Sequence, residues 1–103
     1  MKKLDLRAYL VKVKRTSGEI EEVPYQMKES LIEILFNPSL KLNGVKVLKQ
    51  NALAMKIEAS GDELLLEDEE HERVLHALSL VEGIGRNEVE FARRIIEAES
   101  VTV

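Results

Sequence analysis

Alternating apolar and polar side chains mark the beginning of the chain. Across residues 8–15, the odd-numbered side chains from Tyr9 to Val13 fall on one side of an extended backbone, which is the pattern of a half-buried strand. Gly18 suits the left-handed position of a three-residue loop. Residues 19–23 are therefore predicted to return as the second strand of a hairpin.

Opposite charges and like apolar residues face each other in this hairpin register, which supports it. The facing pairs are Arg15 with Glu19, Lys12 with Glu22, and Val11 with Val23. Pro24 has no N–H to donate, so the ladder is predicted to end there.

Spacings of three and four residues between apolar positions predict four helices farther along the chain. These helices cover residues 25–36, 44–59, 69–81 and 88–98. Asn43 and Asp68 are suitable N-caps for the second and third helices. Asn87 followed by Glu90 predicts a capping box at the start of the fourth.

The second helix is predicted to bury one apolar face. The face consists of Leu48, Ala52, Met55 and Ala59, widened by Leu53 and Ile57. Asn51 marks a point at which this segment could divide into two shorter helices.

Two short segments complete the expected fold. Residues 64–66 either form a strand or lead into the third helix, and residues 101–103 could add a terminal edge strand. The expected class is α+β, with an N-terminal β-hairpin packed on about four α-helices in a single domain over residues 1–103.

Composition narrows the kind of core and the kinds of site. Of the 103 residues, 45% are apolar but only 4% are aromatic, and Trp is absent, so the core should be aliphatic. The absence of Cys excludes a disulfide framework and a thiolate zinc site. A transmembrane helix needs about 20 apolar residues, and no apolar stretch of this chain is nearly that long. We therefore expect no membrane contact and a cytoplasmic location.

Charge is distributed unevenly along the chain. Residues 1–15 carry a net charge of +5, residues 16–57 are neutral, and residues 58–103 carry −9. The basic and acidic parts could be neighbours within the fold. Alternatively, the asymmetry could support head-to-tail self-association or binding of partners of different charge.

The sequence predicts no catalytic, metal-binding or cofactor-binding residue. The acidic run over residues 67–72 suits a helix cap and first turn better than a calcium loop, since it lacks the alternating acids and central Gly. His71 and His76 are five positions apart, so one helix cannot direct both at a single metal ion. No Ser lies in a Gly-x-Ser-x-Gly turn.

Lysines gather on one side of the second predicted helix. Lys46, Lys49 and Lys56 form either a solvated face or a patch for an acidic partner.

The segment Gly83-Ile84-Gly85, between two predicted helices, resembles the turn of a helix-hairpin-helix, a DNA-binding motif. The resemblance implies that backbone amides of the turn and a flanking basic residue, here Arg86, hold a phosphate. Glu88 and Glu90 place negative charge where that phosphate would approach. An ordinary helix–turn–helix connection accounts for the glycines equally well.

These features leave three hypotheses about function. The first is a non-catalytic protein–protein interaction or assembly module, with a protein partner or self-association through the hairpin edge, the basic helix face or the acidic helices. The composition is typical of small accessory proteins of phages or mobile elements. The second is a nucleic-acid-backbone binder that uses the Gly83–Gly85 turn or the basic face. The third is an enzyme that gathers His71 or His76 with carboxylates in a pocket.

Overall fold

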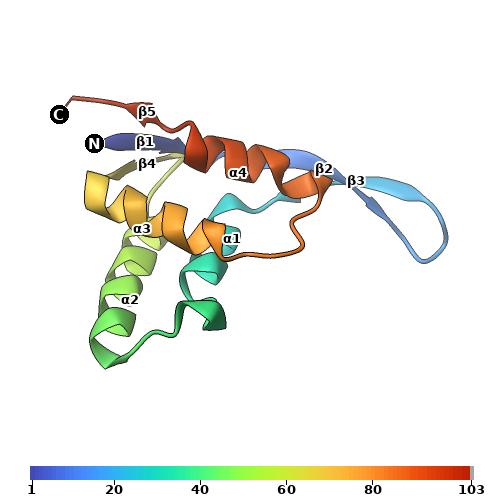
Figure 1. Ribbon diagram of the computed structural model, residues 1–103. Coiled ribbons are helices and arrows are strands. Elements are labelled where there is room, and N and C mark those ends of the chain that lie inside the picture. The colour runs from blue at the N-terminus through green and yellow to red at the C-terminus, as the bar shows by residue number, and fades with distance from the viewer. Residues whose placement is uncertain (103) are drawn as a thin grey trace.

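The computed structural model describes residues 1–102 and has the expected α+β class (Figure 1). The strands are β1 (Lys2–Asp5), β2 (Tyr9–Lys14), β3 (Ile20–Tyr25), β4 (Glu63–Leu66) and β5 (Glu99–Ser100). The helices are α1 (Met27–Leu35), α2 (Gly44–Ala59), α3 (Asp68–Ser79) and α4 (Val89–Ile96), with short 3-10 helices η1 (Pro38–Leu40) and η2 (Arg86–Glu88). The predicted hairpin and four α-helices are confirmed.

A three-stranded antiparallel sheet joins the two ends of the chain. Its order is β4-β1-β5, with Leu4 opposite Leu64 and Lys3 opposite Glu99. The sequence pattern did not predict β1, although it lies at the centre of the sheet. The strand predicted near residues 64–66 is confirmed as β4.

The C-terminal strand lies two residues before its predicted range. The strand β5 covers Glu99–Ser100, and residues 101 and 102 belong to no strand. Val101 still donates a backbone hydrogen bond to Met1 O (2.9 Å), so the pairing with the N-terminus extends beyond β5. Val103 lies outside the described residues.

The hairpin β2–β3 is a separate two-stranded sheet that projects away from the helices (Figure 1). Gly18 occupies the left-handed region, with φ 87°, as the loop requires. The predicted pairs of Lys12 with Glu22 and Val11 with Val23 are confirmed. The prediction that Pro24 ends the ladder is wrong, because Pro24 lies opposite Leu10 and pairing continues to Tyr25. In an antiparallel ladder, hydrogen-bonded pairs alternate with pairs that are not hydrogen-bonded. Counted from the bonded pair Arg15–Glu19, the pair Leu10–Pro24 is not hydrogen-bonded, so Pro24 needs no N–H there.

The core is aliphatic, as the composition predicts, with Phe91 as its buried aromatic residue. The helix α3 packs against α1, α4 and β4, while α4 also contacts β1. Leu4, Leu64 and Leu66 from the sheet join this core and are each no more than 1% exposed. The sheet and the helices therefore share one hydrophobic cluster.

Two of the three predicted caps are replaced by other residues. Asn43 caps α2 as expected, its side chain accepting from Lys46 N (3.0 Å). The N-cap of α3 is Glu67 rather than Asp68, because Glu67 and Glu70 form a reciprocal capping box. The box predicted at Asn87 is absent, since the Asn87 side chain donates instead to Lys12 O (3.0 Å).

The helix α2 is unbroken, but the prediction of its buried face is correct only for Leu53 and Ile57. The residues that it buries are Gln50, Leu53, Ala54 and Ile57. The other four predicted residues, Leu48, Ala52, Met55 and Ala59, are exposed, with Leu48 at 71% and Met55 at 61%. The helix has two apolar stripes, and contacts with α1 on the Leu53 side determine which one enters the core.

Arg94 connects α4 to the segment between β1 and β2. Its guanidinium lies 5.0 Å from the centre of the Tyr9 ring, bonds Glu90 (2.7 Å) and donates to Arg7 O (2.6 Å). It also lies 3.8 Å from the Asp5 carboxylate. One cation thus ties a helix to a strand end and a hairpin.

Acid should weaken this connection. Hydrogen bonds from Arg93 and Arg94 lower the Glu90 pKa from 4.5 to about 2, and a hydrogen bond from Arg7 lowers the Asp5 pKa from 3.8 to about 2. Because both pKa values are depressed in the folded state, the stabilisation is complete above about pH 5 and is lost as the pH falls toward 2. Urea unfolding should show that the free energy of unfolding decreases between pH 7 and pH 2.5. This decrease should be smaller in the Asp5→Asn/Glu90→Gln variant. An equal decrease in that variant would contradict this assignment.

Candidate functional site

One side of α2 is an apolar stripe that the fold leaves exposed. We call it the outer face and define it as Val45, Leu48, Ala52, Met55 and Ala59, all of which are exposed. At 100° per residue these side chains point away from the buried stripe of Gln50, Leu53, Ala54 and Ile57. Figure 1 shows α2 at the margin of the molecule, with α1 and α3 to one side of it.

The spacing along the outer face is three, four, three and four residues. This is the a/d spacing of a heptad, which directs one narrow seam at a second helix. A helix that is apolar on two opposite sides is ordinarily buried on both. The outer face therefore has the pattern of a helix–helix contact that the single chain does not make.

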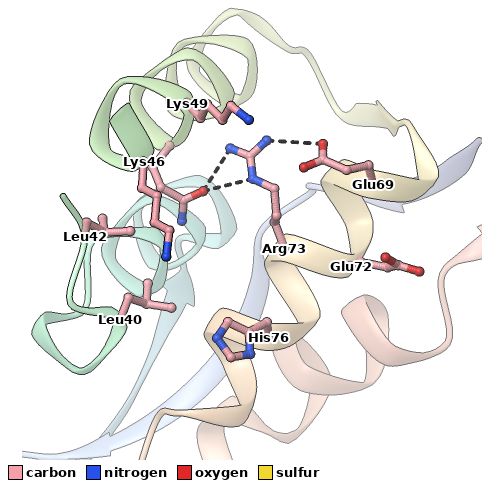
Figure 2. A pocket seen from close by; sticks show the side chains of 9 residues that line it. Leu40, Leu42, Lys46, Lys49, Glu69, Glu72, Arg73 and His76 are labelled. Carbon is pink, nitrogen blue, oxygen red and sulfur yellow. Dashed lines mark hydrogen bonds and ion pairs between the residues drawn. The ribbon is translucent and has the colours of Figure 1, made fainter. Parts of the chain in front are cut away.

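A cleft of about 500 Å³ lies between α2, α3 and the η1 region (Figure 2). Its lining residues are Leu40, Leu42, Lys46, Lys49, Gln50, Glu69, Glu72, Arg73 and His76. Lys46 and Lys49 belong to α2, whereas Arg73 and His76 lie three positions apart on α3. A volume of this size is within the range of small-ligand sites.

A buried glutamine holds Arg73 in position. Gln50 is 5% exposed, donates to Leu35 O (2.9 Å) and accepts from Arg73 Nε (3.1 Å) and Nη2 (2.9 Å). Arg73 Nη1 also lies 3.4 Å from a Glu69 oxygen. The guanidinium is therefore anchored from the protein interior.

The structure separates the three predicted lysines. Lys46 and Lys49 line the cleft, and within residues 1–102 neither forms an ion pair. Lys56 instead pairs with Glu70 of α3 at 2.7 Å. The predicted basic face thus contains two unpaired lysines in a cleft and one neutralised lysine beside it.

The histidines have different surroundings. His71 is buried, and its Nε2 lies 2.7 Å from Ile95 O, a geometry in which the ring N–H donates to the carbonyl. His76 lines the cleft with Glu69 and Glu72. Across residues 1–102 there is no group of three or more His, Asp or Glu side chains that could hold a metal ion.

The predicted turn residues lie in the connection between α3 and α4, away from the cleft. Gly83 has φ 74° and therefore needs the freedom of glycine. A Cβ on Gly85 would lie 3.3 Å from a Glu88 carboxylate oxygen, so a negative charge sits beside the turn. Arg86 lines a separate pocket with Tyr9 and shares no lining with the cleft.

Sequence reasoning missed four lining residues: Leu40, Leu42, Gln50 and Arg73. Gln50 carries a signal in hindsight, because it stands three and seven positions before Leu53 and Ile57 on the buried stripe. Leu40 and Leu42 flank Lys41, which adopts the left-handed region at φ 51°. No local pattern predicts that strained turn.

Comparisons with known proteins give no relative for this chain: no protein-family model, no curated protein and no solved structure matches it. Separately, none of the helices formed by residues 1–102 has both the length and the apolarity required to cross a membrane.

Proposed function

We propose that the chain is a non-catalytic assembly module that pairs with a second copy of itself through the outer face of α2. The observation that carries the proposal is the unbroken heptad spacing from Val45 to Ala59 on exposed positions. Isolated exposed apolar residues are ordinary on protein surfaces, whereas a contiguous stripe marks an interaction site. Such a seam is complementary to another helix with the same spacing, and a second copy supplies one.

The charges at the two ends of α2 favour an antiparallel arrangement. Lys41, Lys46 and Lys49 surround the beginning of the helix, whereas Glu58, Asp62 and Glu63 surround its end. A parallel pair would bring lysines to lysines and carboxylates to carboxylates. An antiparallel pair brings unlike ends together and aligns the helix dipoles favourably.

The carboxylates near the candidate cations favour a protein partner over a nucleic-acid backbone. Glu69 and Glu72 share the cleft with Lys46 and Lys49, and Glu88 stands beside the Gly85 turn. A phosphate backbone needs a surface of net positive charge.

Sedimentation velocity over a range of protein concentrations tests the pairing. We expect the wild type to dimerise and the Leu48→Lys variant to dissociate at least about tenfold more readily, because an ammonium group would enter the apolar seam. The matched control is Leu10→Lys, since Leu10 is 66% exposed on the hairpin and lies outside the seam. A monomeric wild type, or a dimer lost only with Leu10→Lys, would overturn the proposal.

Disulfide cross-linking tests the orientation, because the chain has no native Cys. In an antiparallel pair, Val45 and Ala59 of opposite copies approach each other, while the two Val45 residues lie about 20 Å apart along the axis. A disulfide needs Cα atoms within about 7 Å. We therefore expect Val45→Cys to cross-link with Ala59→Cys in a mixture and not with itself. Self-linkage of Val45→Cys would show a parallel pair.

A further inference from the structure

The cleft beside α2 combines two kinds of wall. Leu40 and Leu42 provide an apolar surface on one side, while Lys46, Lys49 and Arg73 provide cations. In Figure 2, Lys46 extends into the space between Leu42 and Arg73. The cleft can therefore hold a molecule that has an aliphatic part and an anionic part.

Arg73 has free N–H donors, in a fixed position, that can bind an anion. Guanidinium has five N–H donors, and Arg73 uses two on Gln50 and one, at 3.4 Å, on Glu69. Two N–H groups thus remain without a partner in residues 1–102. Because Gln50 is itself buried and bonded to Leu35 O, little conformational freedom is lost when Arg73 binds.

The balance of charge in the cleft suits a singly charged anion. Three cations line the cleft together with Glu69 and Glu72, which leaves a formal charge of +1 when His76 is neutral. A dianionic phosphate would exceed this charge and meet repulsion from Glu69, whereas a carboxylate needs one compensating charge. Figure 2 shows the Glu72 carboxylate turned away from the two lysines, so Glu69 is the principal competitor for Arg73.

The turn that carries the apolar wall is strained. Lys41 has φ 51°, a region that residues other than Gly, Asn and Asp rarely adopt. This turn separates Leu40 from Leu42, both half-buried at the cleft. Strained backbone of this kind concentrates at ligand sites.

We propose that the cleft binds a small organic carboxylate whose aliphatic chain rests on Leu40 and Leu42 and whose carboxylate pairs with Arg73, Lys46 and Lys49. The site rests on the lining of the cleft and not on the outer face, although Lys46 and Lys49 also contribute to the charge argument for the antiparallel pair. Gln50 has a positioning role, because it reaches the ligand only through Arg73.

The test uses hexanoate as the probe, titrated into the ¹⁵N-labelled chain at constant ionic strength. We expect hexanoate to shift the Arg73 Nε–H signal and the amides around Leu40 and Lys46. Acetate tests the carboxylate alone and hexanol the aliphatic chain alone. Each should bind at least tenfold more weakly than hexanoate, because each occupies only one wall.

Three variants distinguish specific binding in the cleft from non-specific electrostatic attraction of hexanoate to the protein. Lys46→Met with Lys49→Met should weaken hexanoate binding at least tenfold, whereas Lys12→Met with Lys14→Met on the hairpin should not change it. Glu69→Gln should tighten binding several-fold, because it removes the carboxylate that competes for Arg73. Hexanoate binding that is absent, equal to that of acetate or hexanol, or insensitive to the Lys46/Lys49 variant would overturn the proposal.

Discussion

Replacing Leu4 with alanine should lower the free energy of unfolding by about 2–5 kcal/mol. Leu4 is 1% exposed on the central strand β1 and lies opposite Leu64, which is also 1% exposed. Removal of its branched end forfeits buried apolar surface and leaves a cavity that the surrounding core closes only in part. Urea denaturation followed by circular dichroism measures the loss.

The same substitution at an exposed leucine is the control. Leu10→Ala, at a side chain that is 66% exposed, should change the free energy of unfolding by less than about 0.5 kcal/mol. Similar losses at Leu4 and Leu10 would contradict the burial of Leu4 in the core.

Replacing Tyr9 with phenylalanine should destabilise the fold by about 1–3 kcal/mol, although it removes a single oxygen atom. The Tyr9 hydroxyl donates to Asn87 O (2.9 Å) and accepts from Phe91 N (3.1 Å), in the first turn of α4. It therefore caps a helix whose own N-cap residue, Glu88, makes no side-chain hydrogen bond. Without the hydroxyl, two polar backbone groups lose their partner in a partly buried position.

Amide hydrogen exchange locates this effect. We expect the Phe91 N–H to exchange faster in Tyr9→Phe, while the ring still stacks on Tyr25 at 4.9 Å between centroids. Asn87→Ala provides the comparison, because it removes only an exposed bond to Lys12 O and should cost less. Unchanged protection of Phe91 would show that the hydroxyl is not the cap.

The same cap explains why the start of α4 was predicted incorrectly. The sequence contains Asn87 and Glu90 at the spacing of a capping box, and local reasoning has no means of weighing them against a tyrosine in a distant hairpin. The boundaries of α2 and the hairpin register, by contrast, follow from nearby residues such as Asn43 and Gly18, and both were predicted correctly. Local chemistry predicts the elements, while a tertiary contact determines how α4 begins.

The candidate site likewise contains residues that could be predicted from spacing along the sequence and residues that only packing brings together. Lys46 and Lys49 share a helix face, so their proximity could be predicted from spacing alone. Gln50 and Arg73 meet only because α2 packs beside α3. The buried face of α2 could not be chosen from sequence, because Leu53 and Leu48 mark two stripes of comparable apolarity on opposite sides of one helix.

The position of β1 has a consequence for biosynthesis. It pairs with β4 on one side, where Leu65 lies opposite Lys3, and with β5 on the other, where Glu99 lies opposite Lys3. This strand therefore emerges from the ribosome long before either neighbouring strand is synthesised. Until then its backbone N–H and C=O groups have no strand to pair with in the same molecule, and they can pair with other nascent chains. Translation that pauses before Glu99 would leave the strand open along one side, whereas the hairpin and the α1–α2 pair can already form from adjacent residues.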